Sequence, residues 1–426
     1  MVVLTKKIAF FILLILVFSL LSGCGSGSKP ENDDGNVGEN NTENNSNENK
    51  DENNPPKQEV DIIREQVNAM TLNEKIGQMV MVGVDGYTIS ENSRKMIDEY
   101  NVGGFILLGE NVSSSNQILT LVNSLKSANS KNKIPLFLSI DEEGGRVSRM
   151  PQEFKKFPSN KIIGGINNTT FSYMIGSLIA SELKGFGLNM DFAPVLDINS
   201  NPNNPIIGDR SFGSDPEIVT KLGIQTMKGI QSGSIVPVVK HFPGHGDTSV
   251  DSHIGLPTVD NTLERLKSFE FLPFSEAIKN NTDAVMIAHI LLPKIDPNNP
   301  ASMSKIIITD NLRNDMKFSG VIITDDMTMG AITKNYNIGA AAVKSVNAGT
   351  DIILVCHLYD NETVVLNALR KAAESSAISE AQINESVYRI LKLKQKYNLT
   401  DNIVKSIDIK SINNEITTLL NTYIKK

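Results

Sequence analysis

The chain has 426 residues, of which 40% are hydrophobic and 21% are charged, and its formal net charge is −7 at pH 7. This length and apolar content suffice for one large hydrophobic core or two modest ones. The negative balance and the lack of a basic stripe argue against nucleic acid as a partner, because phosphate binding needs lysine and arginine side chains in series.

The N-terminus has the pattern of a secretory signal. Lys6 and Lys7 precede an apolar run of 14 residues, Ile8 to Leu21, which is shorter than the roughly 20 residues of a membrane-spanning helix. The run ends in Leu-Ser-Gly-Cys, which resembles the bacterial lipobox, in which the bond before the cysteine is cut and the cysteine is lipidated. The resemblance implies a signal peptide over 1–23 and a lipid anchor on Cys24. The protein would then be extracytoplasmic and tied to the bacterial cell membrane; an ordinary signal peptide with an incidental cysteine is the alternative.

Residues 24–57 are typical of a disordered tether. From Gly25 to Lys57 the chain carries ten asparagines, with eight acidic residues against three lysines and almost no large apolar side chains. Such a segment cannot bury a core, and as a flexible linker its r.m.s. reach would be about 30 Å. An acidic interaction segment is the alternative, but no apolar anchors support it.

Beyond Val60 the chain alternates short apolar runs with amphipathic stretches, as repeated βα units do. We predict eight strands, at 76–84, 104–108, 134–140, 190–195, 235–239, 284–288, 320–324 and 351–355. We predict helices at 113–130, 170–186, 218–232, 263–279, 338–348, 361–376 and 379–397. Eight units indicate one α/β domain over 58–400, a (β/α)8 barrel of the TIM type, with a doubly wound sheet as the alternative. Residues 401–426 are too few for a second core and form a short C-terminal extension.

Polar residues follow five of the predicted strands, where barrel enzymes carry their chemistry. They are the string Asp-Glu-Glu-Gly-Gly-Arg-Val-Ser-Arg at 141–149, Asp197, the pair Lys240 and His241, His289, and the pair Asp325 and Asp326. Each aspartate could instead cap the following helix, and His289 could be a buried core histidine. Five such positions at one end of a barrel predict a polar catalytic mouth.

The segment 240–253, Lys-His-Phe-Pro-Gly-His-Gly-Asp-Thr-Ser-Val-Asp-Ser-His, holds three of the five histidines of the chain. Titratable groups on a glycine-rich loop after an apolar strand indicate proton transfer. A metal site is the alternative, but Pro243 and Gly244 break the helix that would align His241 with His245, and the ligand set is incomplete, so we expect no metal. We expect His245 to hold the loop. A Gly-x-Gly-x-x-Gly turn after a strand is also missing, so we expect no nicotinamide or other cofactor.

Four strings resemble the motifs of glycoside hydrolase family three, in its β-N-acetylhexosaminidase branch. They are the 141–149 string, Gly-Asp-Arg-Ser-Phe-Gly at 208–213, the 240–253 segment, and Thr-Asp-Asp-Met-Thr-Met at 324–329. The resemblance spans about 58–397 and is specific, because the strings agree in type, order and strand-end position. It implies a retaining exo-β-N-acetylglucosaminidase that removes terminal β-linked GlcNAc from muropeptides or related oligosaccharides, in peptidoglycan recycling. A β-N-acetylglucosaminide phosphorylase and a non-catalytic sugar-binding lipoprotein remain alternatives.

The resemblance also implies roles for single residues. Asp325 matches the nucleophile, with Asp326 as runner-up, and His253 matches the general acid/base with Asp251 as its partner. The residues that match the sugar-binding positions are Asp141, Arg149, Arg210, Lys240 and His241. Glu142 stands where a glutamine is common in the family.

These roles agree with the chemistry of a retaining glycosidase, which needs one carboxylate to attack the anomeric carbon and a second group to protonate the departing oxygen. We expect Lys240, Arg149 and Arg210 to lower the pKa of the Asp325 carboxyl. We expect Asp251 to hydrogen-bond and orient the imidazole of His253. Glycines in the loop 244–257 suggest that the loop closes when substrate binds.

Two further expectations complete the reading of the sequence. Cys356 follows an apolar run and is expected to be a small, buried, unpaired side chain. The sequence carries no dimer signal, so we expect a monomer whose partners are a carbohydrate substrate and, through Cys24, the membrane.

Overall fold

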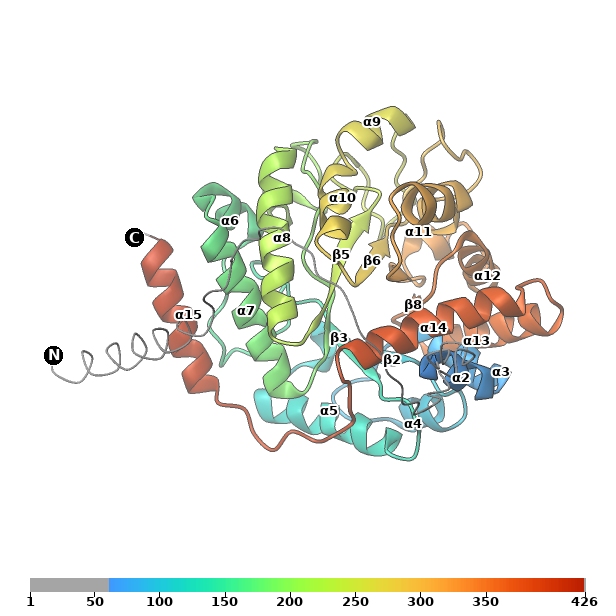
Figure 1. Cartoon of the computed structure of the whole chain (residues 1–426). Coiled ribbons are helices and arrows are strands. Elements are labelled where there is room, and N and C mark those ends of the chain that lie inside the picture. The colour runs from blue at the N-terminus through green and yellow to red at the C-terminus, as the bar shows by residue number, and fades with distance from the viewer. Residues whose placement is uncertain (1–60, 425–426) are drawn as a thin grey trace, which may run out of the picture. The chain divides into compact units, whose positions relative to one another are not determined.

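Eight parallel strands form the centre of the computed structural model, which describes residues 61–424 (Figure 1). The strands are β1 (Val80–Val82), β2 (Gly104–Leu107), β3 (Phe137–Ile140), β4 (Met190–Asp191), β5 (Val236–Phe242), β6 (Ala284–Ile287), β7 (Val321–Thr324) and β8 (Ile353–Val355). Every strand residue is buried, as expected of parallel strands covered on both faces. The predicted signal peptide, the Cys24 anchor and the tether lie outside the described residues.

The strands close into a barrel. They follow one another in chain order from β1 to β7, and β8 pairs with β1 through Met81 and Leu354. The ring is completed between β7 and β8, where Ile323 and Ile352 form a parallel bridge and the Thr324 amide donates to the Ile352 carbonyl at 3.0 Å. The predicted (β/α)8 barrel is therefore confirmed, and the doubly wound alternative is wrong.

Helices surround the strands (Figure 1). The α-helices are α2 (Ile62–Ala69), α3 (Leu72–Gln78), α4 (Glu91–Asp98), α5 (Ser115–Asn129), α6 (Asn160–Ile166), α7 (Thr169–Phe186), α8 (Pro216–Ser232), α9 (Leu263–Ser268), α10 (Leu272–Lys279), α11 (Gly330–Thr333), α12 (Ile338–Ala348), α13 (Tyr359–Glu374), α14 (Glu380–Lys396) and α15 (Ile409–Tyr423). Short 3₁₀ turns lie at η1 (Gly109–Asn111), η2 (Gly208–Arg210) and η3 (Ala301–Met303), and η4 (Ile306–Asp315) is a π-helix.

Several predicted elements differ from the structure: the strands predicted at 190–195 and 235–239 are Met190–Asp191 and Val236–Phe242, and two further differences have a clear local cause. The first strand begins at Val80 and not at residue 76, because a capping box between Thr71 and Glu74 starts α3, which continues to Gln78. The predicted helix at 263–279 is two helices, α9 and α10. Pro273 lies in the first turn of α10, where its missing N–H costs nothing, whereas in the interior of a continuous helix it would break a hydrogen bond.

The C-terminal extension adds a helix to the barrel. In α15, Ile416 and Leu419 are buried, and the ring of Tyr423 stacks on Phe171 of α7 with 4.9 Å between ring centroids. Among residues 61–424, no helix combines the length and the apolar character needed to cross a bilayer.

Candidate active site

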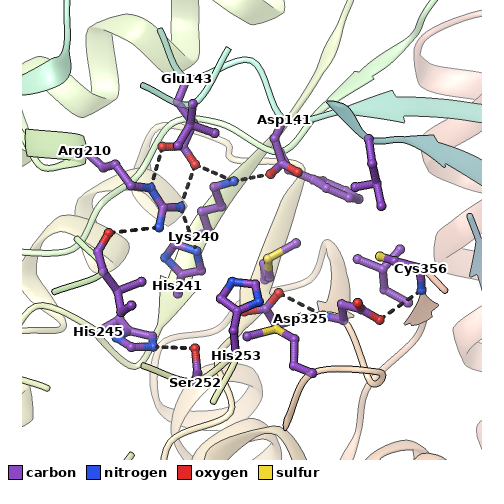
Figure 2. Close-up of a pocket in the computed structure, with 18 of the residues that line it drawn as sticks. Asp141, Glu143, Arg210, Lys240, His241, His245, Ser252, His253, Asp325 and Cys356 are labelled. Atoms are coloured by element: carbon purple, nitrogen blue, oxygen red, sulfur yellow. Dashed lines mark hydrogen bonds and ion pairs between the residues drawn. The ribbon is translucent and has the colours of Figure 1, made fainter. Parts of the chain in front are cut away.

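A cavity of about 330 Å³ opens at the carboxyl ends of the strands (Figure 2). This volume lies in the range of small-ligand sites. The structure brings together in its wall all eight residues to which the sequence assigned a catalytic or sugar-binding role, namely Asp141, Arg149, Arg210, Lys240, His241, Asp251, His253 and Asp325. The predicted convergence is therefore found for the polar residues of β3, β5 and β7, whereas Asp197 and His289 do not line the cavity.

Lys240, at the end of β5, is the centre of a buried ion-pair network (Figure 2). Its Nζ lies 2.5 Å from Oδ1 of Asp141 and 2.8 Å from Oε1 of Glu143. Arg210 donates two hydrogen bonds to the carboxylate of Glu143, from Nε to Oε2 at 2.8 Å and from Nη2 to Oε1 at 2.7 Å. Because bidentate guanidinium–carboxylate pairs fix geometry, this network holds two cations and two carboxylates at set positions in the cavity wall.

Glu143, which is not among the predicted site residues, joins these two cations. Its side chain is 1% exposed. Burial acts to raise its pKa, but Arg210 and Lys240 outweigh burial and hold the pKa of Glu143 below its usual value. The carboxylate therefore stays ionised. The sequence carried no specific signal for this role, because the burial that makes Lys240 need a carboxylate partner is known only from the structure.

His241, next to Lys240 in β5, is oriented by the carboxylate of Asp197. Asp197 was predicted only as a polar residue at a strand end or a helix cap. Nδ1 of His241 lies 2.6 Å from Oδ2 of the fully buried Asp197. Oδ1 of Asp197 also accepts the backbone amide of His245 at 2.6 Å. Burial acts to raise the pKa of Asp197, but His241 more than offsets this and the pKa is lowered. Asp197 thus links the cavity wall to the start of the loop that carries His253.

Asp325 follows β7 directly and faces the cavity (Figure 2). Its amide donates to the Ile287 carbonyl of β6 at 2.9 Å, and its Oδ1 accepts the Asp326 amide at 2.8 Å, so the barrel fixes its position. Burial acts to raise the pKa of Asp325, but charges outweigh it and the pKa is lowered. The expected direction is confirmed, but the lowering comes first from His241 and His289, next from the hydrogen bond of the Asp326 amide and then from Lys240, not chiefly from the arginines.

The loop after β5 brings His253 and Asp251 to the same cavity. Figure 2 labels His253 and Asp325 among the residues that line this cavity. Asp251 was expected to hydrogen-bond the imidazole of His253. In the structure its Oδ1 instead accepts a hydrogen bond from the His253 backbone amide at 2.8 Å. The amides of Ile254 and Gly255 also donate to the Asp251 carbonyl, both at 2.9 Å, so Asp251 forms the turn that presents His253.

The remaining predicted positions take supporting roles. Arg149 lines the cavity, and its amide donates to Oε2 of Glu142 at 2.7 Å. Asp326, the runner-up nucleophile, accepts the amides of Thr328 and Cys356, both at 2.9 Å, and thus holds the chain after β7 and β8. Cys356 is buried as expected and has no disulfide partner among residues 61–424, and burial raises the pKa of its thiol.

The two other histidines of the strand ends differ in their surroundings. His289 is fully buried between the hydroxyl of Ser302 at 2.7 Å and the Asp326 carbonyl at 3.0 Å, so it is a satisfied core histidine. His357, to which the sequence analysis assigned no role, lines the cavity beside Asp326, with 3.8 Å between Nε2 and Oδ2.

Three carboxyl groups with raised pKa values are buried in the barrel, and one of them, Glu142, belongs to the 141–149 string. Glu142, Asp191 and Glu182 are each at most 1% exposed, and each has at least one side-chain oxygen without a hydrogen-bond partner among the described residues. Burial raises the pKa of Glu142 to about 7 and raises those of Asp191 and Glu182 well above their usual values. No group of three or more His, Cys, Asp or Glu side chains within residues 61–424 is arranged to hold a metal ion.

Comparison with known proteins places this site in a family. The family model for the glycosyl hydrolase family 3 N-terminal domain matches residues 71–393. The chain is 38% identical over 333 residues to β-hexosaminidase A of Pseudoalteromonas piscicida, covering 72% of this chain and 56% of that protein. It is 31% identical over 325 residues to a β-hexosaminidase of Nitrosomonas eutropha, covering 74% of this chain and 92% of the relative.

A solved structure agrees with these relatives. The chain is similar to a glycoside hydrolase family 3 β-N-acetylglucosaminidase from Paenibacillus sp. strain FPU-7, with a TM-score of 0.79 and 40% identity, covering 83% of this chain and 69% of that one. The chain thus spans little more than half of the Pseudoalteromonas protein but most of the Nitrosomonas one. The protein belongs to glycosyl hydrolase family 3, in its β-hexosaminidase branch.

Proposed function

We propose that this protein is a retaining exo-β-N-acetylglucosaminidase that works through a covalent glycosyl-aspartate. Its family membership makes it a glycoside hydrolase of the β-hexosaminidase class. One observation carries the finer proposal: Asp325, fixed after β7, and His253, on the loop after β5, line the same cavity. A nucleophile and a proton donor can therefore meet one glycosidic bond.

In the first half-reaction, the Asp325 carboxylate attacks the anomeric carbon of a terminal β-linked GlcNAc. The bond from that carbon to the glycosidic oxygen breaks, and the oxygen takes a proton from the imidazolium of His253. The lowered pKa of Asp325 supports this role, because only the ionised carboxylate is a nucleophile. The product is a glycosyl ester on Asp325 with inverted configuration.

In the second half-reaction, the neutral imidazole of His253 takes a proton from water. The water oxygen displaces the Asp325 carboxylate at the anomeric carbon, and the second inversion restores the β configuration. His253 ends protonated, as it began. In this scheme Asp251 sets the turn that presents His253, through the bond between its Oδ1 and the His253 amide.

We assign sugar binding to Asp141, Arg149, Arg210, Lys240 and His241, which line the cavity around these two groups. Lys240 and Arg210 are anchored by Glu143, so they can donate to sugar oxygens without reorganising. As natural substrates we propose terminal GlcNAc on muropeptides or chitooligosaccharides. Comparing the release of GlcNAc from purified muropeptides and from chitobiose decides between them.

The test of the proposed activity is hydrolysis of 4-nitrophenyl β-GlcNAc followed by NMR from the first seconds. The proposal expects the β-anomer of GlcNAc to form first, with the α-anomer appearing only by mutarotation. An α-anomer formed first contradicts retention. Adding inorganic phosphate separates hydrolysis from the phosphorylase alternative, which would yield GlcNAc-1-phosphate, and failure to cleave any β-GlcNAc would favour the binding-protein alternative.

We also propose that the protein is a lipoprotein of the bacterial cell membrane, cleaved before Cys24 and tethered by residues 24–57 to a catalytic domain that begins near residue 58. The support is the lipobox-like Leu-Ser-Gly-Cys after an apolar run. The test is incorporation of labelled palmitate in a bacterial host. The native chain should be labelled and found in the membrane fraction, and Cys24→Ser should lose both properties; equal labelling of the two chains would contradict the anchor.

A further inference from the structure

The loop that carries His253 is docked on the segment that follows Asp325. The amide of Ala331, in the first turn of α11, donates to the carbonyl of Ser252 at 3.0 Å. One turn later, Nζ of Lys334 donates to the carbonyl of Ile254 at 2.7 Å. These two hydrogen bonds lie on either side of His253, and α11 begins only five residues after Asp325.

Gly330 sets how closely the two segments approach. A Cβ atom at this position would lie 2.5 Å from the His253 carbonyl oxygen and 3.1 Å from that of Ile254. Contacts under 3.0 Å do not occur for real Cβ atoms, and the atoms in the way are backbone, so the loop or α11 would have to move. Gly330 has no positive φ that would demand glycine. The reason for glycine at this position is therefore room for the loop.

A second contact holds the loop from the barrel side (Figure 2). Nε2 of His245 lies 3.2 Å from Oγ of Ser252, and Nδ1 of His245 lies 2.8 Å from Oγ1 of Thr248. His245 and Ser252 are each 2% exposed, and the amide of His245 is bonded to Asp197. Ser252, directly before His253, is thus held by its side chain on His245, which follows the end of β5, and by its carbonyl on α11.

We propose that Gly330, with Lys334, is a positioning element that sets the distance between the proton donor and the nucleophile. The proposal rests on the proposed function, in which His253 protonates the leaving group and Asp325 attacks. The element holds His253 against the chain that carries Asp325, so the two groups face one glycosidic bond at a fixed separation. A methyl group at position 330 pushes the His253 turn outward but leaves Asp325, which is bonded to β6, in place.

Such a displacement has a kinetic signature that a general loss of structure does not give. Good leaving groups depart without a proton, whereas poor leaving groups need one. Gly330→Ala is expected to lower kcat/KM about 10- to 100-fold for alkyl or sugar leaving groups, since positioned acids contribute roughly 10²- to 10⁴-fold. For 2,4-dinitrophenyl β-GlcNAc the change should stay within about threefold, because that leaving group departs as a stable anion without protonation.

The experiment compares a series of aryl and alkyl β-GlcNAc substrates with the full chain and four variants. Gly330→Ala is the main variant. Lys334→Met keeps the aliphatic stem but loses the hydrogen-bond donor to the Ile254 carbonyl. It should lower kcat/KM for poor leaving groups by a smaller factor than Gly330→Ala does. Gly165→Ala on α6, where a Cβ would meet nothing within 4 Å, is the matched glycine control. Lys371→Met, at an exposed lysine of α13, is the matched lysine control.

Hydrogen–deuterium exchange supplies a readout that does not depend on activity. Gly330→Ala should speed exchange in peptides covering 250–257 and leave the strand peptides unchanged. Equal losses of kcat/KM for all leaving groups, or an unchanged loop exchange rate, would overturn the positioning role of Gly330. If the native chain cleaves no β-GlcNAc while loop exchange still responds to Gly330→Ala, the docking stands and the proposed function fails.

Discussion

The carboxylate of Asp197 lies 2.6 Å from Nδ1 of His241, and neither group has any direct contact with Asp325 among the described hydrogen bonds. The pair nevertheless bears on the proposed nucleophile, because His241 is the largest influence that lowers the pKa of Asp325. A buried aspartate outside the cavity lining therefore controls the orientation of a residue inside it.

Replacing Asp197 by asparagine should lower kcat/KM about 10- to 100-fold, since a charged buried hydrogen bond is worth roughly 1.5–3 kcal/mol. The asparagine side chain has one oxygen and no negative charge, so it accepts a weaker hydrogen bond from His241 or from the His245 amide. The His241 imidazole therefore loses its fixed tautomer. Steady-state kinetics measure the loss, and Asp310→Asn at an exposed position is the control. Unchanged kinetics would remove Asp197 from the positioning of His241.

The same variant carries a prediction for stability against pH. The folded pKa of Asp197 is depressed, so its stabilising contribution is present above the unfolded value, about 3.9, and is lost only as pH falls through the lower folded value. The melting temperature of Asp197→Asn should therefore lie below that of the native chain at pH 5 as well as at pH 7. A difference that vanishes at pH 5 contradicts the depressed pKa.

Asp325→Asn should lower kcat on the order of 10⁴-fold, as removal of a catalytic nucleophile does in other covalent enzymes. GlcNAc binding should change little, because the sugar-binding network around Lys240 is anchored by Glu143. Kinetics and calorimetry measure the two effects. Asp326→Asn is the comparison, and it should chiefly lower the melting temperature, because Asp326 accepts the amides of Thr328 and Cys356. A larger kcat loss in that variant would transfer the nucleophile role to Asp326.

His253→Ala should lower kcat/KM roughly 10²- to 10⁴-fold for chitobiose but only slightly for 2,4-dinitrophenyl β-GlcNAc, whose leaving group needs no proton. Because the His253 side chain is exposed, its truncation should leave the fold intact, and melting curves check this. Equal losses on both substrates would take the acid role away from His253.

Glu142→Gln should stabilise the fold at neutral and alkaline pH. Burial raises the pKa of Glu142 to about 7, so the folded state binds the proton more tightly than the unfolded state, and stability falls as pH rises from about 4.5 to about 7. A neutral amide removes this loss, which is on the order of 1–3 kcal/mol. The melting temperature of the variant should exceed the native value at pH 8 and approach it at pH 5. Glu374→Gln on the surface is the control, and an equal gain at both pH values contradicts the raised pKa.

Sequence patterns predicted the barrel because each strand is a short buried run of aliphatic residues followed by polar ones, as at Val321–Thr324 before Asp325. The same rule placed Asp141, Arg149, Lys240, His241 and Asp325 at one end of the barrel, whereas Arg210, Asp251 and His253 were assigned through the family resemblance. The start of the first strand was predicted wrongly, at residue 76, because the apolar run there was assigned entirely to a strand. The capping box of Thr71 and Glu74 indicates the helix α3, which continues to Gln78.

The partners inside the site could not be predicted in this way. Sequence spacing does not reveal that Glu143 joins Lys240 to Arg210. Glu143 and Arg210 are 67 residues apart along the chain. Nor does spacing show that Asp251 bonds to the backbone of His253, or that Gly330 leaves room for that loop. Such pairings depend on which side chains the closed barrel turns toward each other, and that is a property of the tertiary structure.

Trapping the covalent intermediate tests the central claim most directly. The protein is incubated with a fluorinated β-GlcNAc donor that bears a good leaving group, and it is then digested and sequenced by mass spectrometry. The account predicts one sugar per chain, attached to Asp325 and absent in Asp325→Asn. A sugar found on Asp326 or another residue, or full turnover of the donor with an α-anomer as first product and no labelled peptide, would contradict it.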